Sequence, residues 1–326
     1  MREVAPGLLW GRLPVPGALR HINVWAHEDG VGDDLALIDT GLDIPPSREG
    51  WETMFAGALA GKRVARIVCT HFHPDHIGLA GWLARRFAAP LFMTRGEWLF
   101  ARMLTADIRD EPPVEAIAYW RGAGWEEKRI AAETTRGWGR FASVVSPVPV
   151  SYARLRDGDV LRLGARDWRV VTGSGHSPEH ACLVCEADGL MIAGDQVLPR
   201  ITSNVSLSLS EPQADPLGEW LASIEKLKGL PADLLVLPSH GEPFTGLHER
   251  LHALAQGHRG RLDALHEKLA EPRRAVDVFT TLFGRKVSDN VYGLATGEAL
   301  AHLRHLEITG RAERETRDGV WWFRAL

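Results

Sequence analysis

The sequence has little cysteine and no long apolar run. With 3 cysteines in 326 residues, it cannot build a disulfide framework. Cys182 and Cys185 are an odd number of positions apart within an expected strand, so they should lie on opposite faces as packing residues. Residues 1–7 hold two charges and a proline, and no long apolar run follows, so we expect neither a signal peptide nor a membrane span. These absences favour a cytoplasmic protein.

An excess of charge of one sign is also lacking. The chain holds 38 Lys+Arg and 42 Asp+Glu, a net charge of −4, so no overall field draws it to nucleic acid or anionic lipid. Hydrophobic residues make up 45% of the chain and charged residues 25%, an ordinary globular balance, and the length allows two domains. We therefore expect a small-molecule substrate, and neither a membrane nor a nucleic-acid partner.

The most informative motif directly follows the apolar run 64–69. It holds four side chains that can bind metal ions: His71, His73, Asp75 and His76. The first two are two residues apart, so they point the same way in an extended segment. The other two follow in a turn, where they can face a second ion, and a helix should begin near Ile77. Because one zinc site uses three or four protein ligands, this motif and the ligands downstream indicate two ions.

Further candidates stand where other apolar runs meet loops. They are Asp39, His176, Asp195 and His240. Strand ends that run into loops are the usual place for functional groups on a sheet scaffold. An isolated histidine at such a position would be an ordinary polar loop residue. However, no packing requirement explains three histidines and an aspartate within six residues.

These five motifs occur in the order expected of the metallo-β-lactamase superfamily, which the chain resembles over residues 1–243. The resemblance implies an α/β fold, a four-layer αββα sandwich. It implies one metal held by His71, His73 and His176, a second held by Asp75, His76 and His240, and Asp195 bridging the two. Asp39 would orient a ligand histidine and Thr70 would hydrogen bond nearby. His180 would touch the ligands or the substrate, or serve the structure alone.

The motif residues also indicate a subgroup. Asp195 argues against the true β-lactamase branches, which lack an aspartate there, and His73 stands where flavodiiron proteins carry a glutamate. The segment 175–180 is most similar to the glyoxalase II-like hydrolases, although Glu179 replaces their usual glycine. Ser239 stands where the family often has glycine. The motifs alone leave the one-iron sulfur dioxygenases open.

The ligand types suit two divalent ions, zinc above all, with manganese, iron or nickel as alternatives. Two such ions can share a water and lower its pKa to roughly 7, which produces hydroxide at neutral pH. Asp75 would also handle a proton as the leaving group departs. We therefore expect a metal-dependent hydrolase that cleaves an ester or thioester bond of a small organic substrate.

Residues 95–150 interrupt the strand pattern with a mostly helical insert, rich in tryptophan and arginine. The insert follows the first motif, so it could lie over the metal cleft as a cap. The substrate contacts would then include Trp98, Arg102 and Trp120. Alternatively, its aromatic residues pack it onto the sheet or onto a second subunit.

Residues 244–326 read as helices followed by a hairpin that turns at Asp318-Gly319. This order resembles a winged helix, and the combination resembles the β-lactamase-like 2 group, so the alternative activity is that of an endoribonuclease or phosphodiesterase. However, residues 246–326 hold 13 Lys+Arg against 11 Asp+Glu, without the clustered basic face that phosphate contacts need. The apolar run 321–323 must be covered by this chain or by a second copy, which allows a homodimer.

Overall fold

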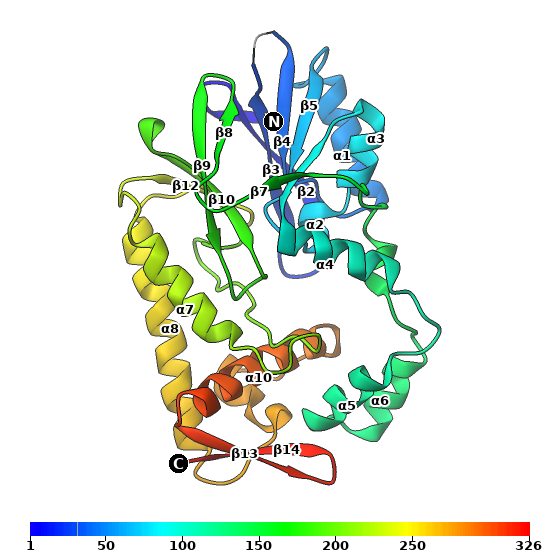
Figure 1. Ribbon diagram of the computed structural model, residues 1–326, viewed down its shortest axis with the longest axis vertical. Coiled ribbons are helices and arrows are strands. Elements are labelled where there is room, and N and C mark those ends of the chain that lie inside the picture. Colours follow the sequence, from blue (N-terminus) through cyan, green and yellow to red (C-terminus); the bar gives the residue numbers. More distant parts are fainter. Residues whose placement is uncertain (31) are drawn as a thin grey trace.

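The computed structural model describes residues 1–30 and 32–326 (Figure 1). Its first large sheet has seven strands in sequence order. They are β1 (Arg2–Ala5), β2 (Leu8–Val15), β3 (Arg20–Glu28), β4 (Asp34–Ile38), β5 (Arg63–Val68), β6 (Leu91–Thr94) and β7 (Ala153–Leu155). The pairs from β1 to β4 are antiparallel and those from β4 to β7 are parallel. The parallel half brings the ends of β4 and β5 to one edge, where the metal-ligand motif begins.

The second large sheet has five strands in the order β12-β11-β10-β9-β8. They are β8 (Val160–Leu163), β9 (Arg166–Gly173), β10 (His180–Cys185), β11 (Leu190–Gly194) and β12 (Leu235–Pro238). Only the pairing of β11 with β12 is parallel. That pairing places Asp195 and His240, which follow these two strands, at the same edge.

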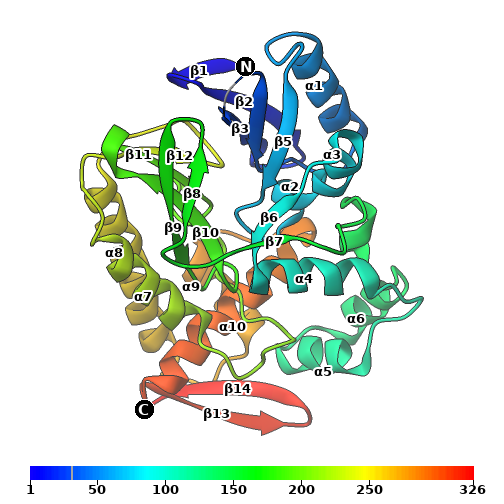
Figure 2. The same ribbon diagram turned by 45° about the horizontal axis from the view of Figure 1, so that its top comes forward.

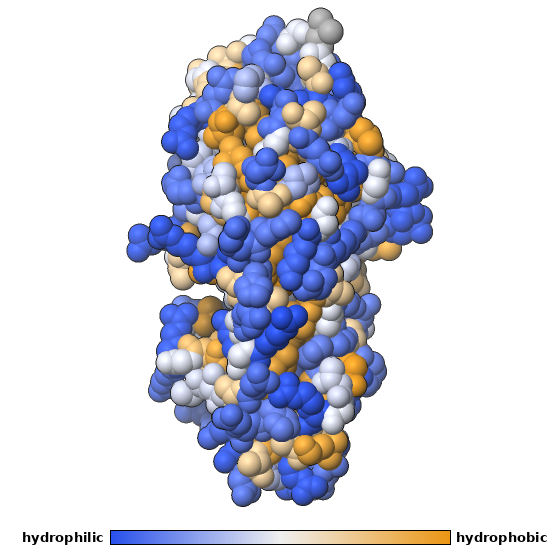
Figure 3. Space-filling view, turned by 90° about the vertical axis from the view of Figure 1, so that its left-hand side faces the viewer, coloured by the Kyte–Doolittle hydropathy of each residue, from blue (hydrophilic) through white to orange (hydrophobic). Residues whose placement is uncertain are grey.

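Helices cover the outer faces of both sheets (Figures 1 and 2). On the first sheet lie α1 (Pro45–Ala56) and α3 (Ala80–Phe87); on the second lie α7 (Pro216–Leu227) and α8 (Leu247–Lys268). Between the sheets, Trp25 and Trp168 belong to one buried apolar core. The expected four-layer αββα sandwich is therefore confirmed. The face that carries α7 and α8 is mainly hydrophilic, with apolar residues in a broken strip (Figure 3).

The two nearby cysteines lie on opposite faces of β10, as expected. Cys182 joins the core beneath α7 and α8, and Cys185 joins the core between the sheets. Both are buried and unpaired. In the described part of the chain, no helix combines the length and the apolar character needed to cross a membrane.

The helix expected from Ile77 begins earlier, which corrects the position of two ligands. Helix α2 spans Pro74–Ile77, so Asp75 and His76 lie in its first turn. Proline suits that first position because its missing N–H has no partner there in any case. Gly78 follows in helical conformation, where a Cβ would lie 2.5 Å from two backbone oxygens. The chain leaves the helical conformation at Leu79, and α3 follows.

The insert contains α4 (Arg95–Ala106), α5 (Val114–Gly122), α6 (Glu127–Thr134) and the short η1 (Arg140–Ser143). Helices α5 and α6 lie against the C-terminal residues (Figure 2). Trp125 Nε1 donates a hydrogen bond to Thr296 Oγ1 at 2.9 Å, and Tyr119 packs edge-on against Trp321. The insert therefore covers part of the apolar run in the C-terminal hairpin.

We call residues 244–326 the C-terminal unit. After α8 it contains η3 (Ala275–Val278), α9 (Phe279–Phe283), η4 (Asp289–Val291), α10 (Tyr292–Ile308), β13 (Ala312–Arg317) and β14 (Val320–Ala325). The hairpin turns at Asp318-Gly319 as expected, with both residues at positive φ. The core beneath the second sheet runs without interruption from α7 into α8 and α10, so a domain boundary at residue 243 stays a prediction, as does the winged-helix comparison.

Candidate metal centre

The first ligand group brings together His71, His73 and His176. The Nε2 of His71 lies 2.9 Å from the Nδ1 of His73 and 3.2 Å from the Nε2 of His176, and the last two atoms lie 3.0 Å apart. Burial lowers the pKa of His73 to about 3 and holds the pKa of His71 well below its usual value. Neutral imidazoles are the form that binds metal. Three ring nitrogens therefore converge on one point.

The opposite nitrogens of two of these rings have fixed partners. His71 Nδ1 lies 3.0 Å from Thr70 Oγ1, and His176 Nδ1 lies 2.7 Å from the backbone oxygen of Asn204. A carbonyl oxygen only accepts, so the N–H of His176 sits on Nδ1 and its Nε2 keeps a lone pair for the centre.

The second group contains Asp75, His76 and His240. His76 Nδ1 donates to Asp39 Oδ2 at 2.8 Å, and His240 Nδ1 donates to the backbone oxygen of His21 at 2.7 Å. Their Nε2 atoms lie 3.7 Å and 3.3 Å from Asp75 Oδ2. The second group thus repeats the arrangement of the first, with one carboxylate in place of an imidazole.

Asp195 lies between the two groups. Its Oδ1 is 3.6 Å from His76 Nε2 and 3.5 Å from His240 Nε2, while its Oδ2 is 3.5 Å from His176 Nε2. Burial alone would raise the pKa of Asp195, but the neighbouring His240 and His76 hold it well below its usual range. One ionised carboxylate therefore faces both ligand groups.

The donor atoms fit divalent cations. Three sets of possible ligand atoms lie within 4.8 Å of one another: His71, His73 and His176; His71, His76 and Asp195; and Asp75, His76 and His240. His76 Nε2, His240 Nε2 and Asp195 Oδ1 are buried without a hydrogen-bond partner. Each such atom would cost roughly 1–3 kcal/mol, and a shared cation would satisfy all three. Nitrogen and oxygen ligands do not by themselves select one metal.

Asp39 and Thr70 stand directly behind the ligands. Asp39 accepts hydrogen bonds from Thr70 N at 2.8 Å and Thr70 Oγ1 at 2.9 Å, in addition to the one from His76. Asp39 has φ 58°, a left-handed conformation that persists only where the surroundings fix it. The resulting network holds the start of the 71–76 motif against the end of β4.

His180 lies beneath Asp195. The backbone N–H of Asp195 donates to His180 Nε2 at 3.1 Å, and the ring centres of His180 and His71 are 4.7 Å apart. Burial holds the pKa of His180 well below its usual value, so the neutral ring can accept this bond. The contact places His180 in a supporting position for Asp195.

Glu97 is a supporting residue that the sequence motifs did not reveal. Its buried carboxylate accepts from Phe72 N at 2.9 Å, Ser177 Oγ at 2.7 Å and Glu179 N at 2.6 Å. Burial raises its pKa to about 7. Glu179 accepts in return from Gly96 N at 2.8 Å, so the residue that departs from the family pattern helps to join the two ligand loops. A lone glutamate in the first turn of a helix gives no sequence signal for this role.

The three expected substrate contacts are engaged in packing. Trp98 and Arg102 donate to carbonyl oxygens within the segment 148–149, at 3.1 and 3.0 Å. Trp120 stacks on Trp125, with ring centres 5.2 Å apart. None of the three lines the cavities described next. These contacts favour the alternative in which the aromatic residues of the insert serve packing, because all three contacts join one part of the segment 95–150 to another.

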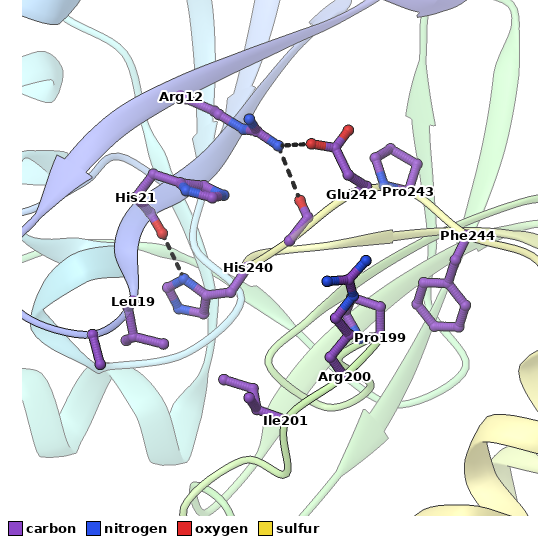
Figure 4. A pocket seen from close by; sticks show the side chains of 12 residues that line it. Arg12, Leu19, His21, Pro199, Arg200, Ile201, His240, Glu242, Pro243 and Phe244 are labelled. Carbon is purple, nitrogen blue, oxygen red and sulfur yellow. Dashed lines mark hydrogen bonds and ion pairs between the residues drawn. The ribbon is translucent and has the colours of Figure 1, made fainter.

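Two cavities reach the ligands from different sides. The cavity beside His73 and His176 has a volume of about 230 Å³; it is also lined by Phe72, Phe100, Asn204, Glu211, Glu219 and Leu294. The cavity beside His240 has a volume of about 710 Å³; it is also lined by Arg12, Leu19, His21, Arg200, Ile201 and Phe244 (Figure 4). The insert therefore contributes Phe100 to a cavity wall.

Comparisons with known proteins agree with this geometry. Residues 19–240 match the family model of the metallo-beta-lactamase superfamily, and residues 262–326 match that of the metallo-beta-lactamase-like C-terminal domain. The crystal structure of a beta-lactamase domain protein from Burkholderia ambifaria is similar, with a TM-score of 0.92 and 38% identity over 100% of this chain and 94% of that chain.

Several curated relatives carry names that describe an activity. The probable metallo-hydrolase YqjP of Bacillus subtilis is 26% identical over 91% of each chain. The atrochrysone carboxyl ACP thioesterase of Emericella nidulans is 23% identical over 90% of this chain and 78% of its own. Because the first family model spans more than half of the sequence, the chain belongs to the metallo-beta-lactamase superfamily.

Proposed function

We propose that the protein hydrolyses an ester or thioester bond of a small organic substrate with the help of two divalent metal ions. The observation that carries this proposal is the position of Asp195, whose two carboxylate oxygens face different ligand groups. Seven ligand side chains also exceed what one tetrahedral site uses.

The chain's own residues would divide the work as follows. His71, His73 and His176 would hold one ion, Asp75, His76 and His240 the other, and Asp195 both. When bound, such a pair polarises the substrate and lowers the pKa of a water to near neutrality. Asp39 and the backbone oxygens of His21 and Asn204 would keep the imidazoles in the orientation that binds metal.

Asp75 would have a second task at the leaving group. Burial by itself would raise its pKa, but the neighbouring His76 and His240 keep its pKa below the usual value. Its side chain keeps 16% of its surface exposed, more than the neighbouring ligands. An ionised and partly accessible carboxylate can take up a proton and deliver it to a departing alkoxide or thiolate.

The named relatives support the choice of bond. One is called a metallo-hydrolase and the other an acyl-carrier-protein thioesterase. Two cavities that each border a different ligand group also suit a substrate with two arms, an acyl part and a leaving part, joined by one scissile bond.

Metal analysis and a substrate panel test the proposal. Protein purified without chelator should contain close to two equivalents of metal, and the metal-replete protein should hydrolyse acyl thioesters or carboxylic esters. The same panel should include phosphodiesters and single- and double-stranded RNA at low and moderate salt. A ceiling of one equivalent after metal loading would contradict the two-ion site. Tight, salt-dependent RNA binding with metal-dependent cleavage would support the endoribonuclease alternative instead.

A further inference from the structure

The two cavities beside the ligands differ in charge as well as in size. We infer that the cavity beside His240 binds an anionic leaving arm of the substrate, while the cavity beside His73 and His176 takes a compact, uncharged acyl part. This inference rests on the proposed function and adds a direction to it: the substrate lies across the ligands in one orientation only.

The cavity beside His240 presents an arginine that has no other task. Arg200 is exposed and makes no hydrogen bond or ion pair with the described residues. Its side chain stands between His240 and Phe244 in Figure 4. By contrast, Arg12 on the opposite wall is paired with Glu242. The unpaired guanidinium is thus free to bind a carboxylate or phosphate group.

The backbone that carries Arg200 is held in place. Arg250 of α8 donates to the carbonyl oxygen of Leu198 at 2.5 Å and to that of Ile201 at 2.7 Å, on either side of Arg200. These bonds fix the loop at both flanks of the arginine. A side chain presented from a fixed loop loses less entropy when it binds a ligand.

Other residues that line the same cavity suit a long ligand arm with both polar and apolar groups. His21 lines the cavity beside His240 and adds an imidazole ring to its wall. Leu19 and Ile201 also line this cavity and are 37% and 48% exposed, so they provide apolar surface for the ligand. The volume of about 710 Å³ lies in the range of ordinary small-molecule sites.

The cavity beside His73 and His176 would repel an anion. Glu211 and Glu219 are part of its lining, which contains neither lysine nor arginine among the described residues. Burial and then the charge of Glu211 raise the pKa of Glu219, as expected for carboxylates that lack a cation nearby. Phe72 and Phe100 supply apolar walls. A small aromatic or aliphatic acyl group fits these walls better than a charged one.

Three thioesters of one acid test the inference. Benzoate is joined to N-acetylcysteamine, which is uncharged, to mercaptopropionate, which carries a carboxylate, and to coenzyme A, which carries phosphates. In the parent protein, at least one anionic thioester should have a lower KM than the uncharged one. Arg200→Ala should raise the ratio of the anionic to the uncharged KM about tenfold, the size of one charge-assisted contact, and Arg200→Glu should raise it further.

Two variants serve as controls for charge and position. Arg200→Lys keeps the positive charge and should restore most of the preference. Arg285→Ala removes an exposed arginine in the C-terminal unit that lines neither cavity, and it should leave the KM ratio unchanged. If the KM of the mercaptopropionate thioester changes in the Arg200 variants, the ligand group is a carboxylate. If the KM of the coenzyme A thioester changes, the ligand group is a phosphate.

The outcomes separate the inference from the function on which it rests. If all three thioesters are hydrolysed and the KM ratio does not respond to Arg200, the inference is wrong and the hydrolase proposal stands. If the metal-replete protein hydrolyses none of them, nor any carboxylic ester, both are wrong. Phe100→Ala should change the ranking of acyl groups on a single thiol without changing the preference for a charged thiol. The reverse pattern would overturn the assigned orientation.

Discussion

The two ligand groups are alike in their atoms but differ in what supports them. In the second group, His76 and His240 are oriented by Asp39 and by the backbone of His21, and both partners belong to the first sheet or its edge. In the first group, His176 is oriented by the backbone oxygen of Asn204, on the long loop between β11 and α7. The second group is thus supported within the sandwich, whereas the first group depends for its His176 on that loop.

The Asn204 loop is attached to the C-terminal unit. Asn204 Nδ2 donates to Glu298 Oε2 of α10 at 3.0 Å. The backbone N–H of Leu207 donates to the oxygen of Gly297 at 3.0 Å. A Cβ on Gly297 would lie 2.7 Å from the hydroxyl of Ser206, so glycine permits this close approach. The C-terminal unit therefore supports one ligand group through the Asn204 loop, without contributing a ligand to it.

Removing the carboxylate of Asp195 should weaken both ligand groups alike, because its two oxygens face different groups. We expect Asp195→Ala to lower kcat/KM by about 10³-fold or more and to weaken the retention of both ions. Turnover of the best ester or thioester and elemental analysis after dialysis measure these effects. Near-parental activity would mean that the assigned ligand set is wrong.

A change at Asp39 should act more strongly on the second group, because Asp39 accepts directly from His76 and reaches His71 only through Thr70. Asp39→Asn keeps a side chain that tolerates positive φ, but replaces one acceptor oxygen with a donor that faces Thr70 or His76. Loss of such a partner typically costs about 10- to 100-fold in metal affinity or activity. Chelator competition should show one ion lost far earlier than the other. Equal loss of both ions would remove the distinction between the groups.

A change at Glu298 should act on the first group, and more weakly, because it acts through Asn204. Glu298→Leu removes the nearer acceptor of Asn204 Nδ2 and leaves only the backbone oxygen of Leu294 at 3.4 Å. We expect a three- to tenfold loss of activity, about the effect of one hydrogen bond. Glu298→Gln keeps an acceptor oxygen and should behave like the parent protein. Chelator competition on both variants shows whether one ion is affected. Identical behaviour of the two variants would argue against the link.

The smallest effect on catalysis should come from the tryptophans of the insert. Trp120→Ala removes the stacking partner of Trp125, so we expect the free energy of unfolding to fall by about 2 kcal/mol. The KM should change less than twofold, because Trp120 lines neither ligand cavity. Chemical denaturation and steady-state kinetics check the two statements, with Trp98→Phe as a milder companion. A large change in KM would restore the original substrate-contact hypothesis.

The sequence predicted the parts of the site whose signal is local. The ligands of the 71–76 motif share one short segment, and the other ligands each follow an apolar run, so residue type and strand ends were sufficient. Supports such as the backbone oxygens of His21 and Asn204 were missed, because a carbonyl group has no residue signature. Glu97 was missed because its three donors come from loops far apart in sequence.

The same distinction holds for the fold. Apolar runs before the ligands indicated β5, β11 and even the four-residue β12. β1 and β7 were not predicted, because charged side chains interrupt their short sequences. The placement of the insert depends on contacts such as that of Trp125 with Thr296. Such contacts join residues about half the chain apart, so no periodicity within the insert could indicate them.

The bond between Asn204 and Glu298 has a consequence for the order of events during synthesis. His71, His73 and His176 are all translated well before α10, yet the loop that orients His176 gains its anchor only when Glu298 has been made and packed. A nascent chain can therefore organise its second ligand group first. We expect full hydrolytic activity to arise late, when α10 has folded onto the Asn204 loop, so that incomplete chains have reduced activity.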